Sequence, residues 1–302
     1  MKEAEEMAVS FAAADTEKII INGKTATAPV RVGHRTDTAV PQAMKINAVF
    51  FDIDGTFFDH VSGMVLPETL TAVKKLRENG YKVCLCSGRA KEMAEQLGVL
   101  QMTAWDGYVG GAGVSVYNER MELISEHAFT REQTARIFEL GRQYDICIQS
   151  HGTYEFMTKP LNPYARQTFA EFHCEVPEVR DWHDEPLVAI SAYEKKGFDW
   201  SMFDDIEGIE LQHPNDTCVD FMQCGINKAT GIRELMDFWG FPHDSYMAFG
   251  DSLNDMEMIQ EAAYGIVMGN GKDALKPYAD LVIGPSNEPG IYHTLKELHM
   301  ID

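Results

Sequence analysis

The chain has 302 residues, which is long for one compact domain and suggests two. Its apolar share of 45% is ordinary for a globular protein, whereas its formal charge of −21, from 26 basic and 47 acidic residues, argues against nucleic acid or an anionic membrane as a partner. No apolar run reaches the roughly 18 to 20 residues that span a bilayer, and the six cysteines are scattered without CxxC spacing, so we expect a cytoplasmic protein with reduced thiols.

Residues 1–43 differ in character from the rest of the chain. Residues 1–6 carry a net negative charge, and residues 30–43 carry Thr, Arg and Pro without sustained periodicity. We therefore expect a loosely ordered N-terminal extension that takes no part in catalysis.

Strands and helices alternate in the segment that follows. We predict a strand, a helix, a strand and a helix, in chain order at residues 48–51, 67–79, 81–86 and 90–97. Pro67 suits the first turn of its helix, and Gly80 suits the end of it. Such alternation produces right-handed βαβ units and a parallel sheet. The Gly-rich stretch 110–113 predicts a turn that leads into an edge hairpin at 114–117.

The order of predicted elements changes in the middle of the chain, and the alternation of strands and helices then resumes. Residues 128–222 predict helices at 131–144, 164–172 and 198–205 and strands at 146–150, 154–158, 187–193, 210–213 and 218–222. After them we predict helices at 229–239, 255–262, 273–276 and 290–298 and strands at 246–249, 265–268 and 281–283. The expected fold is α/β, with a Rossmann-like parallel sheet core in residues 44–127 and 223–302 and an inserted α+β domain in residues 128–222.

Carboxylates follow two of the predicted buried strands. Asp52 and Asp54 follow the strand at 48–51, and Asp251 and Asp255 follow a later one. Ligands bind at the carboxyl ends of the strands in a parallel sheet. Carboxylates gathered there repel one another unless a hard cation such as Mg²⁺ lies between them, and Mg²⁺ prefers a few carboxylates together with phosphate oxygens and water. The pattern therefore predicts a phosphoryl-transfer site.

The segment Asp52-Ile53-Asp54-Gly55 suits a division of catalytic roles. One carboxylate, in contact with the metal, can attack phosphorus and form an aspartyl-phosphate. The other can protonate the leaving oxygen and then take a proton from the incoming water. Taken alone, an Asp-x-Asp-Gly segment is more often a solvated turn. The choice between a solvated turn and a catalytic site therefore depends on the other candidate residues.

Two further turns carry residues suited to phosphate. Ser87 and Gly88 lie where the strand at 81–86 passes into a helix, so the hydroxyl and nearby amides can hold a phosphate there. An ordinary Ser N-cap explains Ser87 about as well. Lys228 lies at another turn into a helix, where its ammonium can neutralise a phosphate, although an isolated Lys is usually solvated.

Together, and in this order, these segments resemble the motifs of the haloacid dehalogenase superfamily of phosphotransferases. Residues 52–56 are similar to the first motif, Ser87 to the second, Lys228 to the third and residues 250–256 to the fourth. The insert between the second and third motifs is similar to the α+β cap of the Cof-type (subclass IIB) sugar phosphatases. The resemblance covers about residues 46–298.

The resemblance assigns a role to each candidate residue. It implies that Asp52 is the nucleophile and a Mg²⁺ ligand, that Asp54 is the acid/base and also binds Mg²⁺ through its backbone carbonyl, and that Asp251 is the remaining carboxylate ligand. The phosphate ligands that it implies are Ser87, with Gly88, and Lys228. The residues that it places in support of the metal and of Lys228 are Asn254 and Asp255.

The expected activity is hydrolysis of small phosphorylated metabolites, above all sugar phosphates, with Mg²⁺ as cofactor. Two other interpretations stay open: a phosphomutase of the phosphomannomutase type, and a non-catalytic protein that binds metal or phosphate. The sequence indicates neither the physiological substrate nor the oligomeric state.

Overall fold

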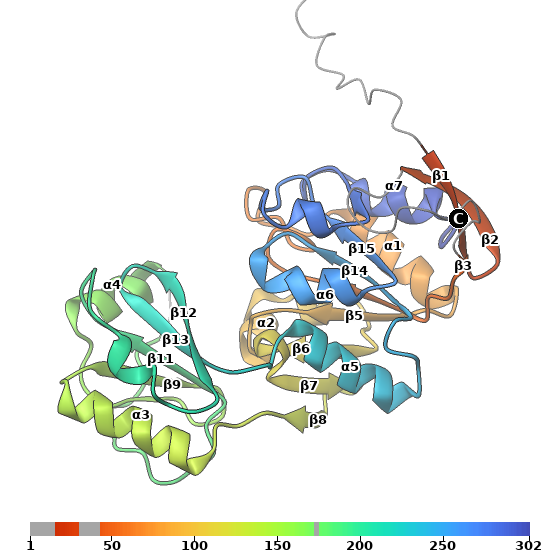
Figure 1. Cartoon of the computed structure of the whole chain (residues 1–302). Coiled ribbons are helices and arrows are strands. Elements are labelled where there is room, and N and C mark those ends of the chain that lie inside the picture. The colour runs from red at the N-terminus through yellow and green to blue at the C-terminus, as the bar shows by residue number, and fades with distance from the viewer. Residues whose placement is uncertain (1–15, 30–42, 172–174) are drawn as a thin grey trace, which may run out of the picture. The chain divides into compact units, whose positions relative to one another are not determined.

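The computed structural model describes residues 16–29, 43–171 and 175–302. The chain forms two compact units (Figure 1). The first contains the described residues up to Ser87 together with residues 98–107 and 236–302, and the second contains residues 88–97 and 108–235. The second unit therefore contains the predicted insert, residues 128–222, together with residues on both sides of it. The domain boundaries expected at 127/128 and 222/223 stay a prediction.

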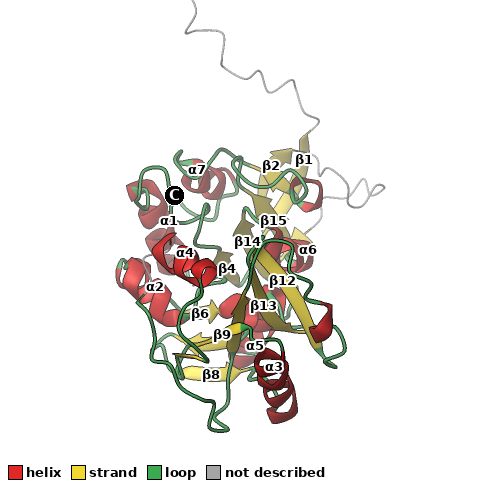
Figure 2. Cartoon of the chain, turned by 90° about the vertical axis from the view of Figure 1, so that its left-hand side faces the viewer, coloured by secondary structure: helices red, strands yellow, loops and turns green. Residues whose placement is uncertain are grey.

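A parallel sheet forms the centre of the first unit. Its strands, in the order β16-β15-β14-β4-β5, are β16 (Leu281–Val282), β15 (Tyr264–Val267), β14 (Tyr246–Gly250), β4 (Ala48–Phe51) and β5 (Lys82–Cys86). Each pairs in parallel with its neighbour. The helices of this unit are α1 (Pro67–Glu78), α6 (Met256–Glu261) and α7 (Gly290–Glu297). Helix α6 packs beside β14 and β15 (Figure 2).

The central strands are apolar because both of their faces are covered. All residues of β4 and β14 are buried, as expected in a parallel sheet with helices on its two sides. Phe51 and Phe249 stack with ring centroids 4.8 Å apart across these two strands. Pro67 begins α1, and Gly80 follows it with φ +88°, a left-handed conformation that glycine adopts without strain. These features match the prediction of alternating strands and helices.

The N-terminal extension differs from its prediction. Residues 16–29 form a hairpin of β1 (Thr16–Ile21) and β2 (Lys24–Pro29), and β1 also pairs with β3 (Ala43–Met44). The hairpin turns at Asn22 and Gly23, both with positive φ, which is the two-residue turn that an Asn-Gly pair favours. The Asn22 side chain also bonds the backbone N–H and C=O of Ile46, both at 2.9 Å. The rest of the expected extension, residues 1–15 and 30–42, lies outside the described residues.

The second unit contains a five-stranded antiparallel sheet. Its strands, in the order β10-β9-β11-β13-β12, are β10 (Phe156–Met157), β9 (Cys147–His151), β11 (Ala189–Tyr193), β13 (Cys218–Gln223) and β12 (Ile209–Asn215). The helices that pack on it are α3 (Arg131–Gln143) and α4 (Pro163–Glu171). The other elements of the unit are α2 (Lys91–Leu97), β6 (Gly107–Gly110), β7 (Ser115–Asn118), β8 (Leu123–Glu126) and α5 (Lys228–Trp239).

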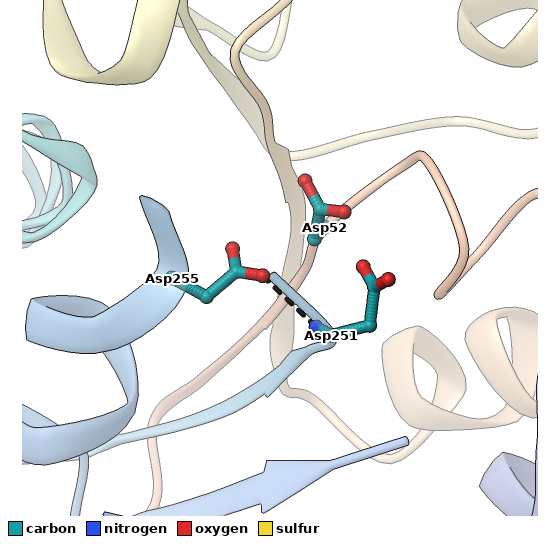
Figure 3. Close-up of side chains that lie close together, drawn as sticks. All are labelled: Asp52, Asp251 and Asp255. Carbon is teal, nitrogen blue, oxygen red and sulfur yellow. Dashed lines mark hydrogen bonds between the residues drawn. The ribbon is translucent and has the colours of Figure 1, made fainter. Parts of the chain in front are cut away.

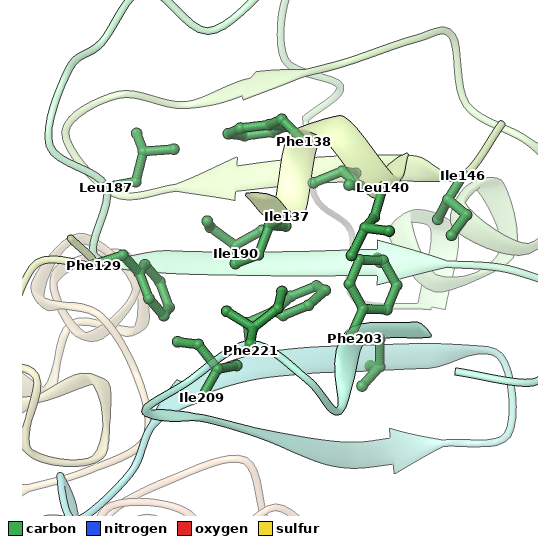
Figure 4. Close-up of a cluster of buried hydrophobic side chains, with 14 of the residues drawn as sticks. Phe129, Ile137, Phe138, Leu140, Ile146, Leu187, Ile190, Phe203, Ile209 and Phe221 are labelled. Carbon is green, nitrogen blue, oxygen red and sulfur yellow. The ribbon is translucent and has the colours of Figure 1, made fainter. Parts of the chain in front are cut away.

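One face of this antiparallel sheet carries a large apolar core (Figure 4). Side chains of α3, such as Ile137 and Phe138, pack there against Ile190 and Phe221 of the sheet. Phe203 also packs edge-on against Phe221, with ring centroids 4.9 Å apart. The α-helix predicted at 198–205 is wrong: only a 3-10 turn forms, at Ser201–Phe203.

Packing against the sheet explains that difference. The Asp199 carboxylate accepts a hydrogen bond from the Ser201 backbone N–H, and the chain turns here instead of continuing as an α-helix. The turn places Trp200 and Phe203 in the apolar core. Within the described residues, no helix is both long enough and apolar enough to span a membrane.

Candidate active site

Three neighbouring parallel strands end at the candidate site, and each is followed by a polar residue. Asp52 follows β4, Asp251 follows β14 and Ser87 follows β5. Asp52 continues the sheet for one more residue, because its N–H donates to the Phe249 carbonyl at 2.9 Å. Asp52 and Ser87 are both buried. The strand-end argument from the sequence thus placed these residues at one edge of the sheet.

Three carboxylates meet at this edge (Figure 3). Asp52, Asp251 and Asp255 each offer an oxygen, and these oxygens lie within 4.8 Å of one another. Asp255 is fully buried, and its Oδ2 accepts hydrogen bonds from the backbone N–H groups of Asp251 and Ser252, both at 2.9 Å. Asp255 therefore fixes the turn that carries Asp251, as well as adding charge to the cluster.

The cluster suits a magnesium ion. Ligand oxygens about 2.0 to 2.1 Å from Mg²⁺ lie about 2.9 to 4.2 Å from one another in an octahedron, which is within the 4.8 Å that limits the oxygens of this cluster. The donors are carboxylates, the type of ligand that Mg²⁺ prefers, and the described residues of the cluster include no thiol or imidazole. Three clustered carboxylates also repel one another unless a cation or protons lie among them. The residues present therefore fit the ion.

The loop after β4 fits against Asp251 only because residue 55 is glycine. Gly55 has φ +81°, and a Cβ built on it would lie 2.5 Å from Asp251 Oδ2. The next residue, Thr56, donates a hydrogen bond to Asp251 Oδ1 at 3.3 Å. The loop that carries Asp54 is thus in direct contact with a proposed metal ligand.

A histidine that the sequence analysis did not single out contacts the proposed acid/base. His60 Nε2 lies 2.7 Å from Asp54 Oδ1, and both side chains are partly exposed. The pair forms because the chain turns back after Gly55, whose N–H donates to the Phe58 carbonyl at 2.9 Å. A spacing of six residues has no fixed meaning in a loop, so the sequence offered no signal for this contact.

A second group of missed residues anchors the same loop from the far end of the chain. Asn270 Nδ2 donates to the Gly55 carbonyl at 2.8 Å, and Asn270 Oδ1 accepts from the Ser286 N–H at 2.8 Å. Ser286 Oγ in turn donates to Asp59 Oδ1 at 2.8 Å, while the Ser62 N–H donates to Asp59 Oδ2 at 2.6 Å. The hydrogen bonds from Ser62 and Ser286 lower the pKa of the buried Asp59 carboxyl. Asp59 is therefore held in its ionised form.

Of the remaining predicted residues, Lys228 and Gly88 belong to the second unit. Lys228 is the first residue of α5 and is completely buried. An ammonium removed from water is stable only beside negative or strongly polar groups, which suits a lysine that binds anions. The start of α5 is tightly packed, because a Cβ on Gly113 would lie 2.0 Å from the carbonyl oxygen of Asn227. Gly88 directly follows Ser87.

Asn254 is exposed and stands outside the carboxylate cluster. It lies in the short turn Leu253–Asp255, and its Oδ1 accepts a hydrogen bond from Ser252 Oγ at 2.6 Å. Its contact is thus with the turn that carries Asp251. The structure brings together Asp52, Asp251 and Asp255 and places Asn254 beside them as part of the same turn.

A parallel α/β sheet with clustered carboxylates at the ends of adjacent strands, and a separate α+β portion inserted in the chain, are features of the haloacid dehalogenase type of hydrolase, and relatives named as phosphatases support a phosphoric monoester hydrolase. The chain belongs to this family: the model of the haloacid dehalogenase-like hydrolases matches residues 49–295. The α/β fold with an inserted α+β portion and the Cof-type resemblance expected from the sequence are confirmed.

Relatives with phosphatase names resemble the chain over most of its length. The HMP-PP phosphatase of Escherichia coli O6:H1 is 27% identical and covers 83% of this chain and 94% of its own length. The phosphoglycolate phosphatase of Methanosarcina acetivorans is 26% identical and covers 84% of this chain and 97% of its own length. The solved structure of BT4131, a subclass IIB sugar phosphatase, shares the fold with a TM-score of 0.69, 24% identity and coverage of 84% and 100%.

Proposed function

We propose that this chain is a Mg²⁺-dependent phosphatase that hydrolyses small phosphomonoesters, above all sugar phosphates, through an aspartyl-phosphate on Asp52. The observation that carries the proposal is the cluster of Asp52, Asp251 and Asp255 at the ends of two adjacent parallel strands. Family membership supports the phosphatase reaction. The ion and the intermediate are our inference from the residues and from the resemblance to the family, and the sugar is our inference from the resemblance alone.

The two carboxylates of the first motif divide the chemistry. The Asp52 carboxylate attacks phosphorus as the bond from phosphorus to the leaving oxygen breaks, and Asp54 gives that oxygen its proton. Water then attacks the phosphorus of the aspartyl-phosphate and loses a proton to Asp54, and the bond from phosphorus to Asp52 breaks. The products are the alcohol and inorganic phosphate. His60, at 2.7 Å from Asp54 Oδ1, orients the carboxyl that carries the proton in both steps.

The other candidate residues hold the reactants in place. Asp52 and Asp251, with the backbone carbonyl of Asp54, would bind the ion, while Asp255 shapes the turn that carries Asp251. When bound, Mg²⁺ neutralises charge between the nucleophile and the phosphate and orients both. In the same proposal the phosphate is bound by Ser87, Gly88 and Lys228.

The proposal is tested with phosphate release from a panel of phosphomonoesters. Turnover should vanish in EDTA and return with Mg²⁺, whereas Ca²⁺ should inhibit, because its looser coordination admits both oxygens of Asp52 and spoils the direction of attack. Asp52→Asn should abolish turnover, and Asp54→Asn should lower kcat by about 10² to 10⁴. Full activity in chelator would contradict the metal site.

A surface carboxylate provides the matched control. Asp273 is exposed and pairs with Lys276 at 2.8 Å, so Asp273→Asn removes the same charge without touching the cluster and should leave turnover unchanged. Residual activity of Asp52→Asn within tenfold of wild type would refute its role as nucleophile. Interconversion of hexose 1- and 6-phosphates with negligible phosphate release would instead indicate a mutase.

A further inference from the structure

The N-terminal hairpin borders a cavity of about 790 Å³ that lies entirely within the first unit. Small-molecule sites in proteins have volumes of about 300 to 1,000 Å³. The lining consists of residues 22–24 of the hairpin turn, 44–47 before β4 and 79–81 between α1 and β5, together with Phe241 and Met300. Figure 1 shows the hairpin beside α7 and the C-terminal end of the chain. We call this space the hairpin cavity.

The hairpin cavity lies at the opposite edge of the parallel sheet from the carboxylate cluster. Asn47 directly precedes β4 and Tyr81 directly precedes β5, whereas Asp52 and Ser87 directly follow these two strands. Asn47 and Asp52 are five residues of extended chain apart, which is about 16 Å. A ligand in the hairpin cavity is therefore not the phosphate ester that Asp52 attacks.

Much of the hairpin cavity lies outside the part of the chain that the family shares. The lining residues 22–24 and 44–47 all precede residue 49, where the match to the family model begins. The reaction of the family therefore does not require this cavity. Its ligand has to be inferred from the chemistry of its own residues.

Hydrogen bonds hold the walls of the hairpin cavity in place. Lys24 Nζ donates to the His299 carbonyl at 3.2 Å, which ties the hairpin to the end of the chain. Asn79 Nδ2 donates to the Met300 carbonyl at 2.7 Å, which ties the end of α1 to the same segment. With the bonds from Asn22 to Ile46, these contacts form the cavity before any ligand binds.

The charge of the lining favours an anion. Lys24 and Lys45 are the charged side chains among the described lining residues, and both are exposed. Within the described part of the chain neither ammonium pairs with a carboxylate, although the chain has 47 acidic residues against 26 basic ones. The carbonyls at the end of α1, which would repel an anion, accept hydrogen bonds from the backbone N–H groups of residues 79–81. Lysine is a common ligand of phosphate groups.

The other side chains of the lining suit a flat ring with polar edges. Tyr81 and Phe241 are partly buried and offer aromatic surface, on which a heteroaromatic base can stack. Asn47 Nδ2 donates to Ser245 Oγ at 2.9 Å, and Asn79 Nδ2 donates to the carbonyl named above. A carboxamide has two donor hydrogens and one acceptor oxygen. Each of the two asparagines therefore keeps a donor and, among the described residues, an acceptor for a ligand.

We propose that the hairpin cavity binds a nucleotide-like ligand, a small anion in which a flat heteroaromatic ring is joined to a phosphate. Lys24 and Lys45 bind the phosphate, Tyr81 and Phe241 contact the ring, and the asparagines bind its polar edge. Because the hairpin and the core both contact the ligand, binding also holds the hairpin against the core. This site does not depend on the phosphatase function proposed above.

Three probes that share parts of one structure test the proposal. AMP has a ring and a phosphate, adenosine lacks the phosphate, and ribose 5-phosphate lacks the ring. Isothermal titration calorimetry in EDTA, which withholds the ion needed for turnover, should show saturable binding of AMP with a Kd below about 1 mM. Adenosine and ribose 5-phosphate should each bind at least about tenfold more weakly. AMP should also slow amide hydrogen exchange at residues 22–25 of the hairpin.

Variants at one lysine connect the binding to the cavity. Lys45→Gln should raise the Kd of AMP by about 10- to 100-fold, the usual effect of losing a hydrogen bond between charged groups. Lys45→Arg keeps the charge and should bind AMP about as well as the wild type. The control is Lys74→Gln, which removes an exposed lysine of α1 that pairs with Glu78 outside the cavity; it should leave the Kd unchanged. All three variants should release phosphate from phosphomonoesters at the wild-type rate.

The outcomes separate this inference from the proposed phosphatase function. The inference would be overturned if AMP did not bind, bound no more tightly than adenosine or ribose 5-phosphate, or bound equally well to Lys45→Gln. Slower hydrogen exchange near Asp52 and Asp251 but not in the hairpin would place AMP in the active site and would also overturn it. Failure to hydrolyse any phosphomonoester would refute the phosphatase alone. Circular dichroism of each variant shows that it is folded before affinities are compared.

Discussion

Replacing Gly55 by alanine should separate the geometry of the site from the stability of the fold. The Cβ would lie 2.5 Å from Asp251 Oδ2 and 2.9 Å from its Cγ. An ordinary contact between carbon and oxygen is about 3.3 Å, so loop and carboxylate must move apart by about 0.8 Å, more than the roughly 0.5 Å that a preorganised site tolerates. A misplacement of about 1 Å can cost about 10² in rate. We expect Gly55→Ala to lower kcat by about that factor and to weaken Mg²⁺ binding.

Gly63 offers a matched control in the same loop region. It also has positive φ, +68°, but nothing lies within 4 Å of a Cβ built there. Both variants should lose about 1 kcal/mol of unfolding free energy from backbone strain, measured by urea denaturation. Only Gly55→Ala should lose activity, measured as phosphate release over a range of Mg²⁺ concentrations. Activity of Gly55→Ala within threefold of Gly63→Ala would refute the argument that this contact positions Asp251.

Two further predictions concern buried carboxylates. Asp255→Ala leaves the N–H groups of Asp251 and Ser252 without their acceptor and should lower the free energy of unfolding, measured by urea denaturation, by about 2 to 5 kcal/mol. Asp255→Asn keeps one oxygen and should lower it by less. Equal losses of unfolding free energy in the two variants would contradict this account. The pKa of Asp59 is lower in the folded protein than in the unfolded chain, where it is about 3.9. Ionisation of Asp59 therefore stabilises the fold at a pH above about 3.9, and this stabilisation is lost as the pH falls through the lower pKa of the folded protein. The difference in unfolding free energy between wild type and Asp59→Asn should therefore shrink from pH 7 to pH 3. A difference that does not change with pH would show that the hydrogen bonds from Ser62 and Ser286 do not favour the ionised form.

The positions of Asp52, Asp251 and Ser87 could be predicted because they depend on one regular feature. Once strands and helices alternate, the strands run parallel and their carboxyl ends share an edge, so any polar residue directly after a strand belongs to that edge. The contacts of His60 and Asn270 could not be predicted in this way. They join loops whose path is set by tertiary packing, and Asn270 lies 215 residues from its partner Gly55.

Two of the errors of prediction have different physical origins. The hairpin at 16–29 was missed although Asn22-Gly23 is a strong turn signal, because the composition of the first 43 residues outweighed a local pattern. The helix expected at 198–205 fails because burial of Trp200 and Phe203 against the sheet favours a tight turn over continued helical hydrogen bonding. In the first case local chemistry decided the structure, and in the second tertiary packing did.

The order in which the chain is synthesised gives the contact between Thr56 and Asp251 a further meaning. These residues are 195 positions apart, yet β4 and β14 are direct neighbours in the sheet. At about 5 to 20 residues per second, Asp251 leaves the ribosome about 10 to 40 s after Thr56. Until then β4 has β5 beside it but lacks β14, its other neighbouring strand, and the first carboxylates lack their partner. A nascent or truncated chain that ends before β14 therefore holds Asp52, the proposed nucleophile, without the rest of the carboxylate cluster, and the cluster is complete only once Asp255 has been synthesised.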